Sequence, residues 1–194
     1  MSNTNPPAEV PEQNETENRF NGSVRDIQIG DIEQLPAILE YWVRDSVTKE
    51  IIPDEVNKII ATIKSSILAQ DGRRFVVAEN NVGQVVGVMG MQTPSYEMME
   101  YATPGETTLE LINAFAMSTQ RGRGAGRAMV TKLEEMARQA GCTELIVNSG
   151  PRYEKTGWPF WKRLYGEPVA IAESIYGPGI DAPVWRKSLV VQNS

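Results

Sequence analysis

Branched apolar residues recur at helical spacing in two stretches near the start of the chain. Within 53–67 they stand at intervals of one, three and four residues: Val56, Ile59, Ile60, Ile63 and Ile67. A similar stripe runs through 31–42, where Asp31 and Gln34 resemble a capping box. Pro53 suits the first turn of a helix because that position needs no backbone N–H. The spacing therefore predicts amphipathic helices over 31–42 and 53–67.

Shorter apolar runs, bounded by turn residues, predict strands along the rest of the chain. These strands cover 23–29, 75–79, 85–91, 107–117, 143–147, 168–172 and 183–191. The turn residues between 79 and 85 join two of them as a hairpin. Two further helices are expected, at 126–140 and at 158–165. This order of elements predicts one α/β domain built on a mixed sheet.

The first residues differ from the rest in composition. Residues 1–22 are rich in Asn, Glu, Pro and Thr and carry little that is apolar beyond Val10 and Phe20. Such a segment cannot bury enough apolar surface to offset its loss of conformational entropy. We therefore expect a disordered tail over 1–22 and a folded domain over 23–194.

Composition and charge argue against several classes of protein. The net charge of -6 disfavours a nucleic-acid binder, because phosphate backbones are held by clustered Lys and Arg. Cys142 is the only cysteine and histidine is absent, so we expect neither an internal disulfide nor a bound metal. No apolar run is long enough to span a membrane, and the N-terminus does not resemble a secretory signal. These observations lead us to expect a cytoplasmic protein.

One segment carries most of the chemical information: Arg121-Gly122-Arg123-Gly124-Ala125-Gly126, called the glycine loop below. It connects a predicted strand to a predicted helix, and the first N–H groups of a helix bind anions because they lack intrahelical partners. Glycines let the backbone approach a phosphate, and the arginines, with Arg127, add forked donors. A Walker A loop would end in Gly-Lys-Ser/Thr, and a dinucleotide loop would read Gly-x-Gly-x-x-Gly. Neither spacing is present, so the loop predicts a site for another phosphorylated cofactor.

The glycine loop resembles the Gln/Arg-x-x-Gly-x-Gly/Ala signature of the GCN5-related N-acetyltransferase superfamily, and the order of elements extends the resemblance over about 23–191. It implies a mixed, mostly antiparallel sheet flanked by helices, with acetyl-CoA or another acyl-CoA as co-substrate. The amides of 122–127 would hold the pyrophosphate. The strand edge near Phe115, Ala116 and Met117 would pair with the pantetheine arm. Asn148 would bond the arm or cap the next turn.

The resemblance also implies direct attack of an amine on the acyl carbonyl, assisted by a base. Glu110 is the candidate base because it lies on the strand where many family members place a glutamate. The alternative is that Glu110 merely points off the sheet. A bulge between 110 and 115 would change which side chains share a face and would let Asn113 reach the substrate.

The general acid is where the sequence departs from the family's Phe-Tyr-x-x-x-Gly-Phe run. The segment that begins at Tyr153 matches in letters, whereas the segment that begins at Phe160 matches in position but has Trp161 in place of the tyrosine. An indole cannot act as an acid at neutral pH. Tyr153 is therefore the first candidate, and the alternatives are Tyr165 or solvent, with no dedicated acid.

Taken together, these features predict an enzyme that transfers an acyl group, acetyl first, from acyl-CoA to a primary amine of a small molecule, amino acid or peptide. A catalytically silent acyl-CoA-binding module is one alternative. Transfer of a longer acyl group to a peptide is another, suggested by the aromatic segment 158–165 and the loop 93–106, which carries Tyr and Met residues. An acyl carrier protein as donor is a third. The acceptor and the oligomeric state stay open, a homodimer included.

Overall fold

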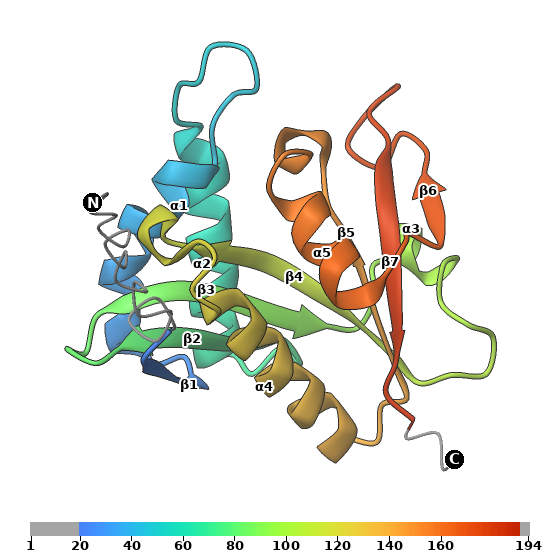
Figure 1. Ribbon diagram of the computed structural model, residues 1–194, viewed down its shortest axis with the longest axis horizontal. Coiled ribbons are helices and arrows are strands. Elements are labelled where there is room, and N and C mark those ends of the chain that lie inside the picture. Colours follow the sequence, from blue (N-terminus) through green and yellow to red (C-terminus); the bar gives the residue numbers. More distant parts are fainter. Residues whose placement is uncertain (1–19, 191–194) are drawn as a thin grey trace, which may run out of the picture.

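The computed structural model describes residues 20–190, and in this part of the chain seven strands form a single sheet. Their order across the sheet is β1-β2-β3-β4-β5-β7-β6. The strands are β1 (Gly22–Asp26), β2 (Arg74–Asn80), β3 (Val85–Gln92), β4 (Thr108–Ala116), β5 (Glu144–Asn148), β6 (Ala170–Ala172) and β7 (Ala182–Ser188). Among them the β4–β5 pair is parallel and the other neighbours are antiparallel. The prediction of a mixed, mostly antiparallel sheet flanked by helices is confirmed (Figure 1).

Helices cover both faces of this sheet (Figure 1). The longer ones are α1 (Leu35–Trp42), α2 (Pro53–Leu68), α4 (Ala125–Gln139) and α5 (Gly157–Tyr165). The short ones are α3 (Tyr96–Met99) and the 3-10 helices η2 (Ile29–Gln34), η3 (Ser118–Gln120) and η4 (Pro151–Tyr153). None of these described helices combines the length and the hydropathy that crossing a bilayer requires.

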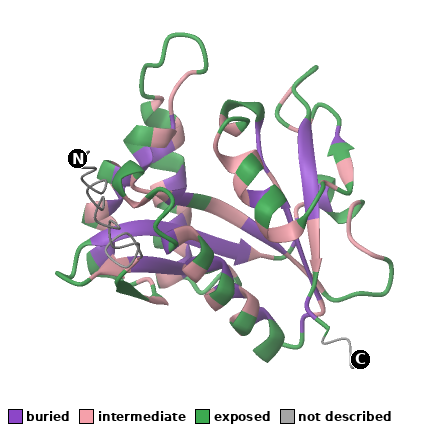
Figure 2. Cartoon of the chain, viewed as in Figure 1, coloured by how far each residue is buried: buried purple, intermediate pink, exposed green. Residues whose placement is uncertain are grey.

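Each face of the sheet has its own hydrophobic core. On one face, Val56 and Ile63 of the α2 stripe pack with buried side chains of α1 and β2. On the other face, Met129 and Leu133 of α4 pack in one cluster with Trp161 of α5. Figure 2 shows the strands between the two layers largely buried, while the helices expose their outer sides. The apolar periodicity of the sequence thus corresponds to the inward faces of the helices.

The first predicted helix is divided in the structure. Instead of one helix over 31–42, η2 ends at Gln34 and α1 begins at Leu35. Pro36 is the reason, because it has no N–H to bond back to the carbonyl of Ile32 and an α-helix cannot run through it undisturbed. The predicted pairing of Asp31 with Gln34 is wrong as well: Asp31 forms a capping box with Gln28.

Other departures lie at the ends of elements and in one loop. The predicted domain boundary at residue 23 is slightly late, since β1 starts at Gly22 and Phe20 packs against the core. The rest of the predicted tail, 1–19, lies outside the described residues. The predicted loop 93–106 contains the short helix α3, which forms because the Ser95 side chain caps its first turn. Met98 of α3 is fully buried.

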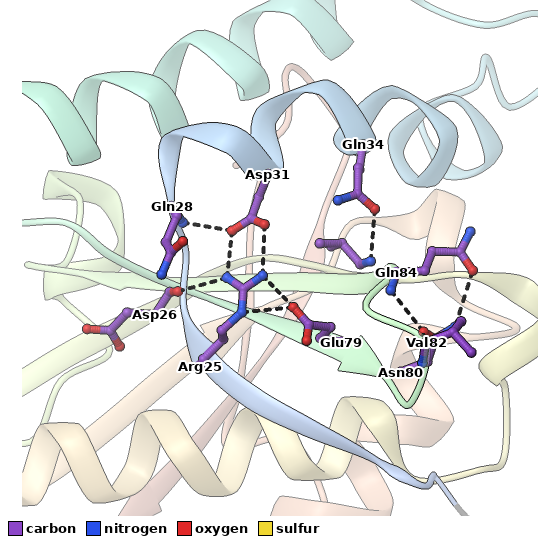
Figure 3. A network of polar contacts seen from close by, with 10 residues as sticks. Arg25, Asp26, Gln28, Asp31, Gln34, Glu79, Asn80, Val82 and Gln84 are labelled. Atoms are coloured by element: carbon purple, nitrogen blue, oxygen red, sulfur yellow. Dashed lines mark hydrogen bonds and ion pairs between the residues drawn. The ribbon is translucent and has the colours of Figure 1, made fainter.

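Arg25 on β1 ties this strand to β2 and to η2 (Figure 3). Its guanidinium donates hydrogen bonds of 2.7 and 2.9 Å to the carboxylate of Asp31 and two more to Glu79. Asp31 is buried, and the hydrogen bonds from Arg25 lower its pKa despite that burial. A buried carboxylate of this kind is destabilising once its partner is removed.

We expect Arg25→Leu to lower the free energy of unfolding by about 1–3 kcal/mol at neutral pH. This is less than for a fully buried pair, because the Arg25 side chain is 31% exposed. Folding lowers the pKa of Asp31, so the ionised carboxylate stabilises the folded protein. This stabilisation is fully present above the ordinary pKa of 3.8, and it is lost as the pH falls through the lower pKa of the folded protein. Urea denaturation at neutral pH and near pH 3 measures both effects.

Lys162→Leu is the matched control. Lys162 pairs with Glu167, but both side chains are mostly exposed, so we expect a change below about 0.5 kcal/mol. Equal losses in the two variants would contradict the special place given to Arg25.

Candidate active site

The two parallel strands at the centre of the sheet pair only briefly. Residues 108–110 of β4 pair with 144–146 of β5, and beyond that point the two strands separate. On its other side β4 stays paired with β3 as far as Ala116. Residues 111–116 of β4 therefore have one edge free of strand pairing, which we call the open edge. Such an edge presents backbone N–H and C=O groups to any extended ligand.

A β-bulge interrupts β4 at the start of the open edge. Gly90 of β3 pairs with Ile112, whereas Val88 pairs with Phe115, so β4 has one residue more than β3 in this interval. Asn113 takes a left-handed conformation with φ of 51°, which Asn tolerates better than most residues. The phase then reverses, so that Ile112 and Phe115 both pack on the α1–α2 face. The bulge anticipated between 110 and 115 is present.

The end of the open edge is formed by Ala116. The N–H of Met117 donates to Val86 of β3 at 2.8 Å, so the backbone groups of Ala116 point the other way, toward the open edge. The carbonyl of Ala116 accepts a hydrogen bond of 2.6 Å from Nε1 of Trp42. Of the three predicted positions, Phe115, Ala116 and Met117, only Ala116 turns its backbone to this edge.

The glycine loop leads from β4 into α4 with its backbone exposed. Gly124 is the residue before the helix and has φ of 105°, a conformation that side chains rarely adopt. The first hydrogen bond of the helix runs from the N–H of Ala128 to the carbonyl of Gly124. The N–H groups of 125–127 precede that bond and have no partner within the helix. At Gly126 a Cβ would come within 3.1 Å of the Phe160 ring, so α5 packs directly on this position.

A cavity of about 490 Å³ joins the glycine loop to the open edge. Its lining comes from α1, β3, β4, η3, the glycine loop, the start of α4 and the segment 149–164. The predicted cofactor residues in the lining are Phe115, Ala116, Met117, Arg121, Gly122, Gly124, Gly126 and Arg127. Four basic side chains line it, Arg121, Arg127, Lys155 and Arg163, and no carboxylate from residues 20–190 does. In a chain of net charge -6, this cavity is thus a positively charged site.

Three predicted cofactor residues lie outside this lining. Arg123 turns its carbonyl to the N–H of Phe20, and Ala125 is fully buried in the core under α4. The Asn148 side chain donates to Sδ of Met98 at 3.0 Å and accepts a hydrogen bond from the hydroxyl of Tyr176. Asn148 therefore links α3 to the loop that carries Tyr176.

Glu110 lies buried at the last residue where β4 still pairs with β5. Its Oε2 accepts hydrogen bonds from the N–H of Ser95 at 2.9 Å and from Nε2 of Gln92 at 3.3 Å. Burial raises the pKa of Glu110 above its usual value, and these two hydrogen bonds only partly oppose the shift. Glu110 is not among the cavity residues; Ala114, four positions further along β4, is.

Tyr153 lines the cavity from η4, directly after β5. Its ring meets the edges of two other rings, Phe115 at 6.2 Å and Trp42 at 6.4 Å between centroids. Burial raises the pKa of the Tyr153 hydroxyl, although the nearby charge of Arg152 opposes it. The hydroxyl therefore keeps its proton at neutral pH and is able to donate it.

Tyr165 and Trp161, the other positions considered for the general acid, do not line the cavity. Tyr165 hydrogen-bonds Oε1 of Glu134 on α4 at 3.2 Å, and burial together with that carboxylate raises its pKa strongly. Trp161 is only 3% exposed and packs edge-on against Phe160 inside the core. A common pocket between the aromatic segment 158–165 and the loop 93–106 stays a prediction. In the structure α5 lines the cavity, and Met98 of the loop packs with Ile146 and with Val184 of β7.

Several cavity residues were not predicted from the sequence, Trp42, Lys155 and Arg163 among them. Arg163 shares a face of α5 with Pro159, which also lines the cavity, but nothing in the sequence marks Pro159 as a site residue. Trp42 belongs to the apolar stripe predicted over 31–42, and nothing local distinguishes a core indole from one at a site.

Comparisons with known proteins agree with this geometry. A model of the acetyltransferase (GNAT) family matches residues 35–166. No curated protein matches the chain in sequence. Among solved structures, the chain resembles a GNAT superfamily phosphinothricin acetyltransferase from Sinorhizobium meliloti in complex with acetyl-CoA. The TM-score is 0.63 at 18% identity, over 87% of this chain and 88% of the other.

Two further structures have similar values. The ribosomal-protein-alanine N-acetyltransferase of Brucella melitensis has a TM-score of 0.63 at 21% identity, over 86% of this chain and 99% of the other. The aminoglycoside 6'-N-acetyltransferase of Enterococcus faecium has a TM-score of 0.62 at 13% identity, over 89% and 99%. At these identities the likeness concerns the fold. The family match includes the bulged strand, the open edge and the glycine loop, and the chain belongs to the acetyltransferase (GNAT) family.

Proposed function

We propose that the protein transfers an acyl group, acetyl first, from acyl-CoA to a primary amine by direct attack in a ternary complex. The observation that carries the proposal is the cavity, which brings the amides of the glycine loop, the open edge and Tyr153 into one space. Its four basic side chains and lack of a lining carboxylate suit a polyanionic cofactor. Solved relatives of the same fold include complexes with acetyl-CoA and with coenzyme A.

In this proposal each part of the cofactor meets a different part of the cavity. The pyrophosphate binds the free N–H groups at the start of α4, with Arg121 and Arg127 beside it. The pantetheine arm runs along the open edge toward the bulge and pairs with Ala116. This places the thioester near Ala114 and Phe115, which line the same cavity next to Tyr153.

The chemistry then needs a proton acceptor and a proton donor. The amine nitrogen forms the new C–N bond as the C–S bond breaks, and its proton passes through water to the carboxylate of Glu110. The thiolate leaves and takes a proton from the Tyr153 hydroxyl. The raised pKa of Glu110 makes it a better proton acceptor while it is ionised, and the raised pKa of Tyr153 keeps its proton in place.

The acceptor is a primary amine in this proposal, on a small molecule, an amino acid or a peptide. The three relatives are named for acceptors as different as phosphinothricin, an aminoglycoside and the alanine of a ribosomal protein. An amino group is common to these acceptors, and little else is. The class of acceptor group is therefore better supported than any particular molecule.

We expect Gly122→Asp to weaken CoA binding at least about tenfold relative to Gly122→Asn. The added carboxylate would face the pyrophosphate at short range in a partly desolvated site. Gly122 has φ of 75°, which Asp and Asn tolerate similarly, and a Cβ there meets no atom within 4 Å. Isothermal titration with CoA measures both dissociation constants. Equal affinities in the two folded variants would remove the glycine loop from the cofactor site.

Glu110→Gln tests the base. We expect kcat with acetyl-CoA and a panel of amines to fall about 10²- to 10⁴-fold. The wild-type kcat/KM should fall as the pH drops through the pKa of Glu110, which lies above 4.5, and the variant should lose this acid limb. Thiol release measured across pH shows both. Tight CoA binding by the wild type without thiol release from any pair would instead favour a silent binding module.

The same substitution also has a predicted effect on stability. Folding raises the pKa of Glu110, so the protonated side chain stabilises the folded protein. This stabilisation is fully present below the pKa of Glu110 in the unfolded chain, and it is lost as the pH rises through the higher pKa of the folded protein. At neutral pH the ionised Glu110 is therefore destabilising, and Glu110→Gln should unfold at the same or a higher urea concentration. A large loss of stability would mean that a fall in kcat reflects misfolding.

Tyr153→Phe tests the acid, with Tyr165→Phe as its control. We expect the first variant to lower kcat about tenfold or more with little change in KM for acetyl-CoA, because it removes only the donated proton. The second removes a hydroxyl that bonds Glu134 outside the cavity, so kcat should stay within about twofold. Equal effects in steady-state thiol release would argue against Tyr153.

A further inference from the structure

Trp42 at the C-terminal end of α1 contacts three parts of the candidate site at once. Its indole N–H donates to the carbonyl of Ala116 at 2.6 Å. The guanidinium carbon of Arg121 lies 5.4 Å from the centroid of its ring, within the range of a cation–π contact. The ring also meets Tyr153 edge-on, and Trp42 lines the cavity. Among the described residues, Trp42 alone makes both the hydrogen bond to Ala116 and the cation–π contact with Arg121.

The contact with Ala116 concerns the end of the open edge. The Ala116 carbonyl is directed to that edge, where a ligand amide would otherwise be able to bond it. A buried or half-buried carbonyl without a partner is costly, and the indole satisfies it in the absence of any ligand. The bond fixes the orientation of the peptide bond between Ala116 and Met117. It leaves the N–H of Ala116 as the backbone group that would meet the pantetheine arm.

The contact with Arg121 concerns the first residue of the glycine loop. Arg side chains lose conformational entropy when they bind a phosphate, and a contact that already restricts them reduces this cost. No ion pair with a carboxylate holds Arg121 among the described residues, so its charge is not neutralised by the protein. The Trp42 ring therefore restricts the side chain of Arg121 without cancelling the charge that a pyrophosphate would meet.

We propose that Trp42 is a positioning residue for the acyl donor: its N–H sets the end of the open edge for the arm, and its ring holds Arg121 for the pyrophosphate. This rests on the proposed function, because it requires that acyl-CoA occupies the cavity. Trp42 comes from α1, so it also connects the cofactor cavity to a helix that is remote in sequence from the glycine loop. Its effect should appear in KM for the donor and hardly in kcat.

Two substitutions separate the two contacts. Trp42→Phe removes the N–H but keeps a ring beside Arg121, whereas Trp42→Leu removes both. We expect KM for acetyl-CoA to rise about threefold in the Phe variant and about tenfold or more in the Leu variant, with kcat within about threefold of wild type. Tyr41→Leu is the control: Tyr41 is 47% exposed, does not line the cavity and meets the Trp42 ring edge-on at 5.0 Å between centroids, so this variant removes a ring beside Trp42 but neither of the two proposed contacts.

A truncated donor, S-acetylpantetheine, tells which part of the cofactor each contact serves, because it lacks the pyrophosphate and the nucleotide. The Phe variant should raise KM by the same factor for both donors. The further increase in KM of the Leu variant over the Phe variant should occur with acetyl-CoA alone. An equal further increase in KM with both donors would overturn the role of Arg121. A Trp42→Leu variant whose KM for acetyl-CoA matches that of Tyr41→Leu would overturn the proposal as a whole.

CoA binding by titration keeps this test apart from that of the proposed function. Wild-type protein that does not bind CoA contradicts the proposed function itself. Wild-type protein that binds CoA, together with an unchanged affinity in folded Trp42→Leu, contradicts only the role of Trp42. The urea midpoint of each variant shows whether it is folded.

Discussion

The candidate site depends on one constraint: β4 and β5 are parallel neighbours whose pairing stops after three residue pairs. A parallel pair needs its partner strand in register to satisfy the backbone, and here β5 turns away while β4 continues. The bulge at Asn113 occurs just after this point and reverses the faces of β4. Backbone groups at the centre of a sheet, normally inaccessible, are thereby left free in a cavity. The glycine loop and α4 follow β4 closely, so the same strand leads into the proposed phosphate site.

Charge is distributed unevenly over this framework. The chain as a whole is acidic, yet the side chains that line the cavity include four bases and no acid from the described residues. The buried carboxylates of the described residues lie elsewhere: Asp31 is bonded to Arg25, Glu110 to the loop that carries Ser95, and Glu144 to Thr103. The cavity therefore offers a polyanion a local concentration of positive charge in a chain whose net charge is negative.

Much of the fold could be predicted from the sequence because its elements have strong local patterns. The α2 stripe, the hairpin turn before Val85 and the Gly-rich start of α4 each specify a local geometry. Pro36 also carried information on the division of the first helix, which periodicity alone overlooked. The site was less predictable, because its members come from distant segments. The direction of the Ala116 backbone depends on a bulge, and the role of Trp42 depends on where α1 docks.

One close contact lies in the wall of the cavity. Phe160 of α5 packs over Gly126, in the first turn of α4, which is the helix that begins the proposed phosphate site. The family signature permits alanine at this position, but in this chain a methyl group would lie 3.1 Å from the Phe160 ring, which would have to shift by a few tenths of an ångström. The absence of a side chain at residue 126 therefore lets α5 pack this closely on the start of α4. Among relatives, the residue at this position and the one facing it from α5 should vary together, as a matched pair of sizes.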